Sequence, residues 1–316
     1  MKRNCLYCYL PLDGDGDGDF HKKCSKTFFG KEEAPTVSYT LDEMSELAKN
    51  VVEQSIAVPG VQAKLSMQLI KESLDQTKDR LTVVGALGGN YIFKPPSANF
   101  VEMPENEHVT MRIAEAFGIN VVASSLIRLK SGEFAYITKR IDRTVSGEKI
   151  HMIDMFQITE AFDKYIGTME RVGKALNEHS ANTLLDKLFF FELAIFSFLT
   201  GNNDMHLKNF SMIRTPSGWS LAPAYDLLNV HILNPEDKDE FALLLGGKKR
   251  NFSRAYFERF GEGMGLTGNQ LKGVFNRFLQ NKPKAIEWIA KSFLSEGMKA
   301  EYVKLLSKRY DKLYQS

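Results

Sequence analysis

Apolar residues alternate with polar ones in short segments between residues 55 and 142, which is the spacing of β-strands with one buried face. Two of these segments, LTVV at 81–84 and NYIFKP at 90–95, are joined through a run of glycines. The segments VVASSLIRL and EFAYITKRI indicate a hairpin that turns at Ser131 and Gly132. The pattern therefore predicts a small, mostly antiparallel sheet.

Helical spacing precedes this sheet and interrupts it. Thr40 and Glu43 form a capping box, in which each side chain accepts a hydrogen bond from the backbone N–H of the other, and a helix is expected from there to about Gln54. A second helix is predicted at residues 104–117 and should end at Gly118, because glycine readily adopts the left-handed conformation that ends helices. We expect this second helix to pack against the sheet.

The second half of the chain is predicted to be mainly helical, with two short strands, FSMIR and WSLAP, between Phe210 and Pro223. A sheet followed by helices predicts an α+β fold with a small antiparallel-sheet N-terminal lobe, a mostly helical C-terminal lobe and a cleft between them. The helices are expected at residues 153–162, 181–199, 253–260, 268–280 and 298–313. A change of composition near residue 35 adds a third part, so that the chain divides into 1–35, 36–142 and 143–316.

The composition, 43% hydrophobic and 25% charged, is that of a globular protein with a sizeable core. Lys and Arg total 41 against 39 Asp and Glu, and the net charge of +2 gives no electrostatic reason for direct binding to nucleic acid. We find no signal-peptide pattern and no stretch near the roughly 18 apolar residues of a membrane span. The three cysteines are an odd count, which argues against a disulfide framework. We therefore expect a cytoplasmic protein with no membrane association.

Two closely spaced pairs of soft metal ligands stand near the N-terminus, Cys5 with Cys8 and His21 with Cys24. Four such ligands at this spacing are typical of a tetrahedral Cys3His zinc site, with the run DGDGDGD as the loop between the pairs. The alternative is a metal-free knuckle with reduced, buried thiols. Calcium is excluded, because Cys24 stands where an EF-hand loop needs glutamate. A zinc knuckle here is expected to be a docking surface rather than part of the chemistry.

The loop GNNDMHLKNF, between the helix at 181–199 and the strand FSMIR, carries Asp204 and Asn209. Phosphoryl transfer to a hydroxyl needs a carboxylate that orients the nucleophile and takes its proton, and it needs oxygen ligands for Mg²⁺. The spacing Asp-x-x-x-x-Asn is the one found in kinase catalytic loops. Asp226 follows the strand WSLAP, where a second metal-binding carboxylate is expected. For the pair alone, the alternative is an ordinary polar loop.

Lys94 ends the predicted strand NYIFKP and could leave the sheet to reach the phosphates of a nucleotide. Its partner should be an acid on the following helix, and both Glu107 and Glu105 are placed for this role. The alternative is an edge-strand lysine in solvent. The turn at Gly60 ahead of Lys64 could present backbone N–H groups and an ammonium to phosphate oxygens, although it matches neither a Walker A nor a GxGxxG motif.

Six segments occur in the order and spacing of the HipA kinase family, and over about residues 55–316 the chain resembles that family. They are VPGVQAKLSM, YIFKPP, ENEHVTMRIAEAFGINV, ITKRIDR, GNNDMHLKNF and LAPAYDLLNV. The resemblance implies a two-lobed, protein-kinase-like fold that binds ATP and Mg²⁺ between the lobes.

The resemblance also implies which residues bind the nucleotide. Gly60, Gln62 and Lys64 match the phosphate-binding loop of the family, and Lys94 matches the lysine that contacts ATP. The adenine-binding hinge corresponds to the segment from Lys139 to Ile141. Other members carry an acid where this chain has Lys139, so the adenine contacts are expected to differ.

Catalytic roles are implied in the same way. Asp204 matches the catalytic aspartate of the family, and Asn209 and Asp226 match its magnesium ligands. His206 and Lys208 lie inside the catalytic loop, and we expect them to position either the loop or the phosphate. The resemblance thus assigns proton transfer to one side chain and metal binding to two others.

The family resemblance implies a toxin that phosphorylates serine or threonine, typically on an aminoacyl-tRNA synthetase, and thereby stalls translation. A HipB-like helix-turn-helix antitoxin restrains such a kinase and represses the operon. DNA is therefore expected to be contacted only through the antitoxin. The compact basic run at 248–250 is interpreted as a solvated loop.

Two departures from the family pattern concern the part before and around residue 60. Full-length HipA proteins carry an additional N-terminal subdomain of roughly a hundred residues, a common domain size. Too little chain precedes residue 55 for this subdomain, as in the shorter HipT branch, so a separate small protein is expected as a further partner. Family members also autophosphorylate on a serine just ahead of the glycine turn, but this chain has Ala-Val-Pro at 57–59 and only Ser55 nearby.

Two other functions stay open from the residues alone. One is a kinase-like binding module that acts by assembling with its antitoxin on operator DNA. The other is a kinase of small molecules, because the same chemistry serves any hydroxyl acceptor. The loops at 144–150 and 165–180, which would shape the acceptor site, have no derivable conformation.

Overall fold

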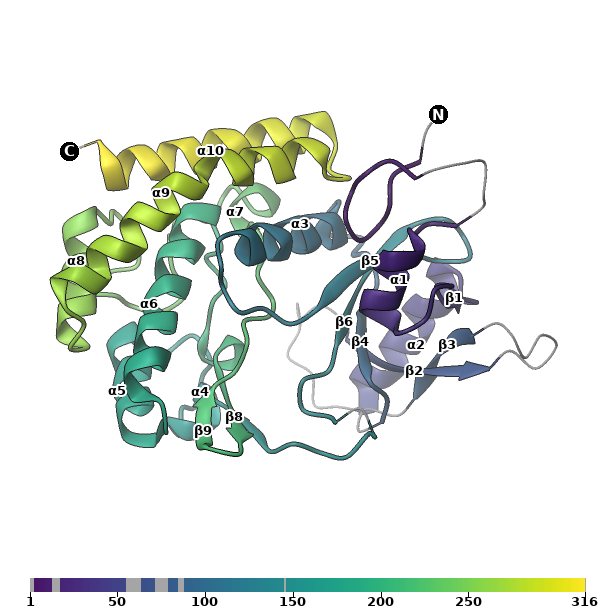
Figure 1. Ribbon diagram of the computed structural model, residues 1–316, viewed down its shortest axis with the longest axis horizontal. Helices are drawn as coiled ribbons and strands as arrows, with labels where there is room; N and C mark the ends of the chain where they lie inside the picture. The colour runs from purple at the N-terminus through teal and green to yellow at the C-terminus, as the bar shows by residue number, and fades with distance from the viewer. Residues whose placement is uncertain are drawn as a thin grey trace. The chain divides into compact units, whose positions relative to one another are not determined.

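The computed structural model describes residues 3–12, 18–54, 64–71, 79–84, 88–144 and 146–315. These residues form two compact units, whose helices and strands are labelled in Figure 1. The sheet unit comprises Met1–His108, Val122–Lys149 and Lys291–Phe293. The helical unit comprises Val109–Val121, Ile150–Ala290 and Leu294–Ser316.

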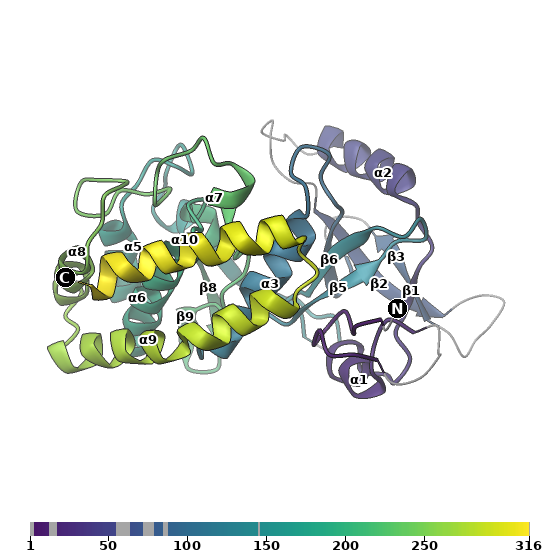
Figure 2. The same ribbon diagram turned by 90° about the horizontal axis from the view of Figure 1, so that it is seen from above.

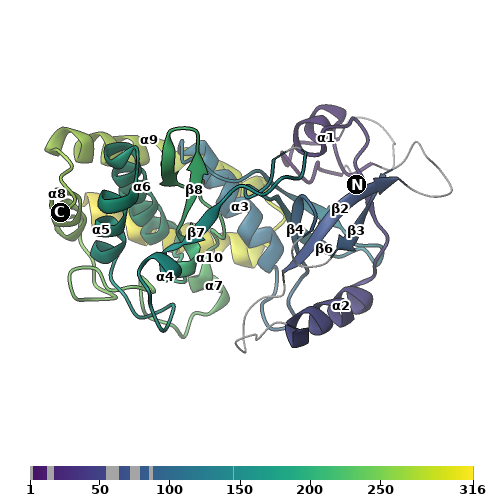
Figure 3. The same cartoon turned by 90° about the horizontal axis from the view of Figure 1, so that it is seen from below.

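Six strands form one sheet in the sheet unit, in the order β1-β3-β2-β4-β6-β5. All neighbours run antiparallel except β1 and β3, so the predicted antiparallel sheet is confirmed. Although β3 and β4 are joined by the glycine-rich segment, they are not neighbours, because β2 pairs with both of them (Figure 3). The strands are β1 (Thr36–Val37), β2 (Leu65–Lys71), β3 (Asp79–Val84), β4 (Tyr91–Lys94), β5 (Ser124–Arg128) and β6 (Phe134–Lys139).

Glycines at two turns of this sheet adopt the left-handed conformation. Gly132, with φ 108°, lies in the turn between β5 and β6, where the predicted hairpin is confirmed. Gly89, with φ 76°, precedes β4, and a Cβ atom there would collide with the Met67 carbonyl on β2. Only glycine lets the chain pass this close to the neighbouring strand.

Helices α1 (Lys22–Phe29) and α2 (Leu41–Gln54) complete the core of the sheet unit. The buried side chains of Phe28 on α1 and Met44 on α2 belong to the same apolar cluster as residues of β2, β3, β4 and β6. The capping box at the start of α2 is confirmed: the Thr40 N–H donates to Glu43 Oε2 over 2.7 Å, and the Glu43 N–H donates to Thr40 Oγ1 over 3.3 Å. Helix α1 was not predicted.

Helix α3 (Met103–Ala116) is the second predicted helix of this region, and it ends as expected at Gly118, with φ 80°. The Gly118 N–H donates to the Glu115 carbonyl over 3.0 Å, as in helix ends closed by a left-handed residue. Its first turns belong to the sheet unit and its remainder, from Val109 on, to the helical unit. The side chains of residues 106–110 are all buried.

The helical unit is built around α6 (Thr183–Thr200), which is apolar on nearly all sides and buried from Phe190 to its end. Helix α10 (Glu296–Tyr314) packs against α6, and α9 (Gly268–Lys291) runs beside α10 (Figure 2). Two tyrosines of α10 join it to α9: Tyr310 and Tyr314 donate hydrogen bonds to backbone carbonyls of α9 over 2.7 and 2.8 Å. Other helices of this unit are α4 (Met155–Ile158), α5 (Met169–His179), α7 (Val230–Leu233) and α8 (Arg254–Gly263).

Two buried acidic residues of α6 have polar partners. Asp186 accepts hydrogen bonds from Ser180 Oγ over 2.6 Å and from the Leu221 N–H over 2.7 Å. Glu192 forms an ion pair with Arg277 at 2.7 Å. Across the part of the chain that the structure describes, no helix is both long and apolar enough to cross a membrane.

A second sheet, in the order β7-β8-β9, contains the two predicted strands as β8 (Ser211–Thr215) and β9 (Gly218–Leu221). The helix predicted at 153–162 is only partly confirmed: residues 153 and 154 belong to β7 (Met152–Asp154), which pairs antiparallel with β8 (Figure 3), and α4 covers only residues 155–158. Asp154 then caps the short α4, where it accepts from the Gln157 N–H over 2.9 Å. Helix α5 was not predicted, and α9 continues past the expected end at 280 although Pro283 lies within it.

Candidate active site

The loop after α6 presents the candidate catalytic residues of the helical unit. The helix ends at Gly201, which adopts φ 72° and donates its N–H to the Phe198 carbonyl over 3.3 Å. A Cβ atom at Gly201 would clash with the side chains of Leu305 and Asn229, so glycine is required both by the turn and by close packing. A buried helix thus places Asp204 on a fixed loop between α6 and β8.

Asp204 and Asn209 are held together within this loop. Asn209 ends the 3₁₀ turn Leu207–Asn209 and is 7% exposed, whereas Asp204 is half-buried. The Asn209 Nδ2 donates to the Asp204 backbone carbonyl over 3.0 Å. Because the amide nitrogen makes this hydrogen bond, the amide oxygen is the atom of the Asn209 side chain that can act as a metal ligand. An oxygen donor of this kind fits a hard cation such as Mg²⁺.

A tyrosine hydroxyl contacts the carboxylate of Asp204. Tyr165 donates to Asp204 Oδ1 over 2.9 Å, and its ring meets that of His206 edge to face with centroids 5.2 Å apart. Burial, followed by the charge of Asp204, raises the pKa of Tyr165, so the hydroxyl keeps its proton and stays a donor. Sequence reasoning missed Tyr165 as a site residue, because it lies 39 positions from Asp204 and in no recognised motif.

The hairpin of β8 and β9 brings Asp226 to the same end of the sheet as Asn209. The Ala222 N–H donates to the Ser211 carbonyl over 2.8 Å, which aligns the residues after β9 with those before β8. Tyr225 strengthens this alignment, because its hydroxyl bonds Ser211 Oγ at 2.6 Å and donates to the Lys208 carbonyl over 3.0 Å. Asp226 itself is half-buried and adopts φ 62°, a conformation uncommon for residues other than glycine.

The other two predicted residues of the loop differ in exposure. His206 is buried, and its backbone N–H donates to the Asp204 carbonyl over 2.8 Å. Lys208 is exposed, with its Nζ 4.9 Å from the centre of the Phe156 ring. Burial raises the pKa of Asp154 although the positive charge of Lys208 acts in the opposite direction. His206 therefore belongs to the frame of the loop, and Lys208 to its surface.

In the sheet unit, Lys94 on β4 forms a buried ion pair with Glu107 on α3. The Lys94 Nζ lies 2.5 Å from Glu107 Oε1, and the two residues are 3% and 0% exposed. The ammonium also lies 5.2 Å from the centre of the Tyr136 ring. The sequence left Glu105 and Glu107 open as partners, and the structure selects Glu107. A buried pair of this kind is weak evidence for stability and is typical of functional sites.

Lys139, in the predicted adenine-binding hinge, lies on the opposite face of the sheet from Lys94. In the register of β4 and β6, Lys139 pairs with Tyr91 and Lys94 pairs with Tyr136, and side chains three apart on a strand point to opposite faces. The Lys139 Nζ lies 5.6 Å from the centre of the Phe28 ring, and burial lowers the pKa of this lysine. The side chain of Lys139 therefore does not lie beside that of Lys94.

Arg140, which sequence reasoning did not single out, fixes the chain directly after β6. Its guanidinium donates to both carboxylate oxygens of Asp142, over 2.8 and 2.7 Å. It also bonds Ser66 Oγ at 3.1 Å and the Gly88 carbonyl at 3.2 Å. Ile141, the last hinge residue, is half-buried between these two charged residues. The sequence segment ITKRIDR could have indicated this contact, because a bidentate pair needs an arginine and an acid close together.

The predicted phosphate-binding loop is described only at its end. Lys64 is exposed and directly precedes β2. Gly60 and Gln62 lie outside the described residues, as do Ser55 and the Ala-Val-Pro segment at 57–59.

The N-terminal cysteines and histidine come together in the sheet unit. The ligand atoms of Cys5, Cys8, His21 and Cys24 all lie within 4.8 Å of one another. All three thiols are free. The His21 Nδ1 lies 3.4 Å from the Cys8 Sγ and 3.8 Å from the Cys24 Sγ.

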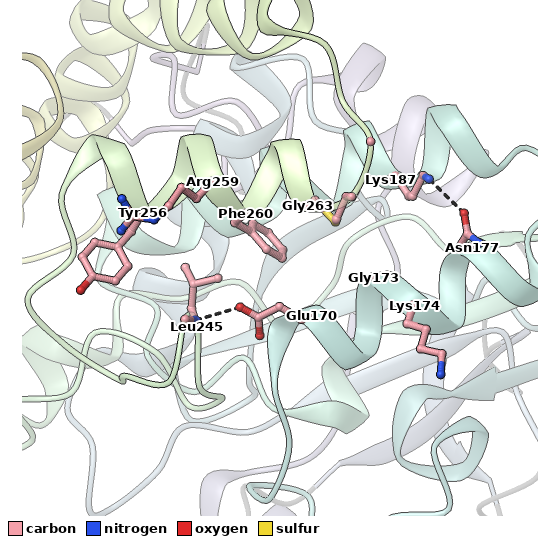
Figure 4. A pocket seen from close by; sticks show the side chains of 13 residues that line it. Glu170, Gly173, Lys174, Asn177, Lys187, Leu245, Tyr256, Arg259, Phe260 and Gly263 are labelled. Carbon is pink, nitrogen blue, oxygen red and sulfur yellow. Dashed lines mark hydrogen bonds between the residues drawn. The ribbon is translucent and has the colours of Figure 1, made fainter.

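A surface pocket of about 700 Å³ lies in the helical unit between α5 and α8 (Figure 4). Charged side chains line it from several elements, among them Glu170, Lys187 and Arg259. The Glu170 carboxylate accepts a hydrogen bond from the Gly246 N–H over 2.8 Å, and Lys187 donates to Asn177 over 3.0 Å. None of the described residues that line this pocket belongs to the candidate catalytic set.

Residues 56–286 match the family model of the HipA-like C-terminal domain. The chain is 29% identical over 275 residues to a Haemophilus influenzae protein named as a candidate kinase, with 77% of this chain and 78% of that protein covered. It is 28% identical over 255 residues to the serine/threonine-protein kinase toxin HipA of Shewanella oneidensis, with 73% of this chain but only 56% of that protein covered.

The fold is similar to that of a chain in the solved complex of Shewanella oneidensis HipA, HipB and operator DNA. The TM-score is 0.70 at 22% identity, covering 88% of this chain and 72% of the other. At this identity the likeness concerns the fold alone, and it confirms the predicted α+β, HipA-like architecture of a sheet lobe and a helical lobe.

Proposed function

Because the chain belongs to the family of HipA-like C-terminal domains, we propose that it is a Mg-ATP-dependent protein kinase that phosphorylates serine or threonine. The arrangement of the loop after α6 carries this proposal. There, Asp204 has its backbone carbonyl bonded to the Asn209 amide at 3.0 Å and already accepts a hydrogen bond from a hydroxyl group. A carboxylate that receives a hydroxyl is what phosphoryl transfer to serine or threonine needs.

The oxygen donors of the helical unit fit Mg²⁺, which would neutralise charge on the phosphates of ATP. Asn209, through its amide oxygen, and Asp226, through its carboxylate, are the residues that would hold it. Lys94 would contact a phosphate of ATP, with Glu107 fixing the direction of the ammonium. Lys64, with the loop of Gly60 and Gln62, would add further phosphate contacts.

Asp204 would orient the acceptor hydroxyl and take its proton as the phosphoryl group is transferred. A half-buried carboxylate suits this role, because it is shielded from bulk water yet reachable by a side chain of another protein. His206, through its backbone bond to the Asp204 carbonyl, would keep the loop in shape. Lys208, which is exposed, could meet a phosphate oxygen or the acceptor.

We further propose that the kinase is the toxin of a toxin–antitoxin pair, with a HipB-like helix-turn-helix protein as its antitoxin. The Shewanella oneidensis complex of HipA with HipB and operator DNA supports this partner. The net charge of +2 favours contact with DNA through the antitoxin only. The acceptor would be a protein of translation such as an aminoacyl-tRNA synthetase, and a separate small protein would supply the N-terminal subdomain.

The test is transfer of labelled phosphate from Mg-ATP into proteins of a bacterial lysate. Wild-type protein should label a discrete acceptor, and Asp204→Ala should reduce labelling by about 10²–10⁴-fold, because proton transfer and positioning act in the transition state. ATP affinity should change little. Asp311→Ala, an exposed aspartate of the same unit, is the matched control and should label like wild type.

Two outcomes would contradict the proposal. Labelling that persists in Asp204→Ala would remove Asp204 from the catalytic role. Binding of ATP by the wild type without any labelled protein would favour a binding module or a kinase of small molecules. Mass spectrometry of a labelled band would identify both the acceptor and the modified residue.

A further inference from the structure

The four soft ligands of the N-terminal segment have the spacing of a metal tetrahedron. A tetrahedral zinc ion with Zn–S bonds of about 2.3 Å and a Zn–N bond of about 2.0 Å separates its sulfur and nitrogen ligands by about 3.5 Å. The His21 Nδ1 lies 3.4 Å from the Cys8 Sγ and 3.8 Å from the Cys24 Sγ. The Cys5 Sγ completes the set, with all four atoms within 4.8 Å of one another.

The hydrogen bond made by one ring nitrogen of His21 determines which of the two nitrogens can bind a metal ion. The Nε2 lies 2.9 Å from the Pro11 carbonyl, which can only accept, so Nε2 carries the hydrogen. Nδ1 therefore presents a lone pair toward Cys8 and Cys24. Metal-binding histidines characteristically donate their other N–H to a carbonyl or carboxylate in this way, which fixes both tautomer and ring orientation.

The backbone around the ligands is equally ordered. The turn from Cys5 is closed by the Tyr9 N–H, which donates to the Cys5 carbonyl over 2.9 Å, and by the Cys5 N–H, which donates to the Leu10 carbonyl over 2.9 Å. His21 is the N-cap of α1, so Cys24 stands in the first turn of that helix. Two rigid pieces of chain, a tight turn and a helix start, thus supply two ligands each.

We propose that these four residues bind a structural Zn²⁺ ion, and that the zinc-bound segment supports the buried pair of Lys94 and Glu107. The segment lies outside the part of the chain that matches the family model, residues 56–286. Soft thiolate and imidazole ligands select zinc over Mg²⁺ or Ca²⁺. We name residues 3–12 and 18–29 the zinc knuckle.

A short series of contacts runs from the zinc knuckle to that pair. Tyr9 directly follows the ligand Cys8, and its hydroxyl lies 2.7 Å from the His108 Nδ1 on α3. His108 directly follows Glu107, the partner of Lys94 at 2.5 Å. Tyr9 is 1% exposed and His108 0%, so neither side chain exchanges its partner for water. Displacement of Tyr9 would therefore move the start of α3.

The zinc knuckle is also joined to the sheet itself. The Leu126 N–H of β5 donates to the Leu6 carbonyl over 3.4 Å, and Asp19 forms an ion pair with Arg128 at 3.1 Å. The buried Phe28 of α1 belongs to the core of the sheet unit. Loss of the metal should therefore loosen the sheet unit near β4 and α3, and not only the knuckle.

The metal is tested first on the full chain, purified without chelators. We expect one zinc per chain by elemental mass spectrometry, and a large loss in Cys8→Ser and in Cys24→Ser. Lys23→Ala, an exposed residue between the ligands His21 and Cys24, is the matched control and should keep its zinc. A zinc content well below one per chain that is equal in the wild type and in Cys8→Ser would contradict the proposed site.

Substitution of Co²⁺ into the wild-type protein gives a measurement that needs no variant to fold. Intense tetrahedral d–d bands and sulfur-to-cobalt charge-transfer bands are expected. Weak octahedral bands without sulfur charge transfer would overturn the proposal equally.

Hydrogen exchange of the zinc-loaded and the chelated protein, without nucleotide, tests the support of the pair. Chelation should remove protection in the zinc knuckle, in β4 and in residues 103–108 of α3, and it should leave α9 and α10 unchanged. Tyr9→Phe, which keeps the ring and removes the hydroxyl that contacts His108, should retain zinc and lose protection only in α3 and β4. Changes confined to the knuckle in both experiments would overturn the proposed support.

Discussion

The hydroxyl of Tyr165 donates a hydrogen bond to the Asp204 carboxylate, and an acceptor serine or threonine would contact a catalytic base in the same way. It donates to Asp204 Oδ1 over 2.9 Å, and its raised pKa keeps it a donor. Phe162 and Ile166, on either side of Tyr165, are exposed apolar residues. This segment therefore combines a hydroxyl that occupies the carboxylate with a surface that an incoming protein could cover.

If Tyr165 competes with the acceptor for Asp204, Tyr165→Phe should raise kcat/KM for a protein acceptor. The increase should be about ten- to a hundredfold at most, because a hydrogen bond to a charged group contributes about 1.5–3 kcal/mol. Steady-state kinetics with a purified acceptor measures it, and Tyr256→Phe serves as the control in the same unit. A lower kcat/KM would mean that Tyr165 instead positions Asp204 for catalysis.

Asp226 offers a substitution that separates charge from backbone conformation. Its φ of 62° is tolerated by asparagine better than by alanine, so Asp226→Asn should keep the local fold while removing one negative charge. The affinity for Mg-ATP should fall by about ten- to a hundredfold, since a charge-assisted ligand contributes about 1.5–3 kcal/mol. Calorimetric titration measures this loss, with Asp311→Asn as the matched control. Equal losses for Mg-ATP and for ATP in a chelator would contradict a metal ligand.

At the scale of elements, the correctly predicted features are those whose hydrogen bonds join residues a few positions apart in the chain. The capping box of α2 and the glycine end of α3 each depend on positions two to four apart, and both are as expected. The helix predicted at 153–162 is only partly correct, because apolar spacing over so short a segment fits either a helix or a strand. Pairing with β8, far along the chain, makes residues 153 and 154 a strand and leaves only the short α4 as helix.

The candidate site shows the same limit. Local spacing indicated that Asp204 acts with Asn209, and that Lys94 pairs with either Glu105 or Glu107. Only the structure shows that the partner of Lys94 is Glu107, which is buried on α3. The contacts of Tyr165 with Asp204 and of Tyr9 with His108 join residues 39 and 99 positions apart. No periodicity relates positions so distant, and only the packed units bring them together.

Glu105 on α3 supplies a prediction of how stability depends on pH. Burial, with a smaller contribution from the charge of Glu102, raises its pKa to about 7 from the ordinary 4.5. The folded state thus holds a proton that the unfolded state releases between these values, so stability falls as pH rises from about 4.5 to about 7 and is constant above. Glu105→Gln removes this penalty and should gain, relative to wild type, at most about 3 kcal/mol at pH 8.

Denaturant unfolding at pH 4 and pH 8 measures this gain for both proteins. The difference between Glu105→Gln and wild type should be larger at pH 8. Glu46→Gln, on the exposed side of α2, should show no such increase. A gain that does not depend on pH would show that the ionisation of Glu105 carries no penalty in the folded state.

For the whole molecule, the proposed function assigns nucleotide contacts to residues of both units, Lys64 and Lys94 in one and Asn209 and Asp226 in the other. Binding of a ligand stabilises the folded protein by mass action, so a substitution that weakens ATP binding should reduce the stabilisation that ATP gives. Both tryptophans, Trp219 and Trp288, belong to the helical unit. Their fluorescence therefore reports the unfolding of that unit alone.

Mg-ATP should raise the Tm of the helical unit followed by tryptophan fluorescence, and Lys64→Ala in the sheet unit should reduce that rise. A tenfold loss of affinity removes about 1.4 kcal/mol of stabilisation, or about 3–5 °C for a unit of this size. Lys64 is exposed, so its removal should leave the Tm without ATP unchanged. Lys130→Ala, at another exposed lysine of the sheet unit, is the control. A full rise of Tm in Lys64→Ala would mean that this lysine makes no contact with the nucleotide that stabilises the helical unit.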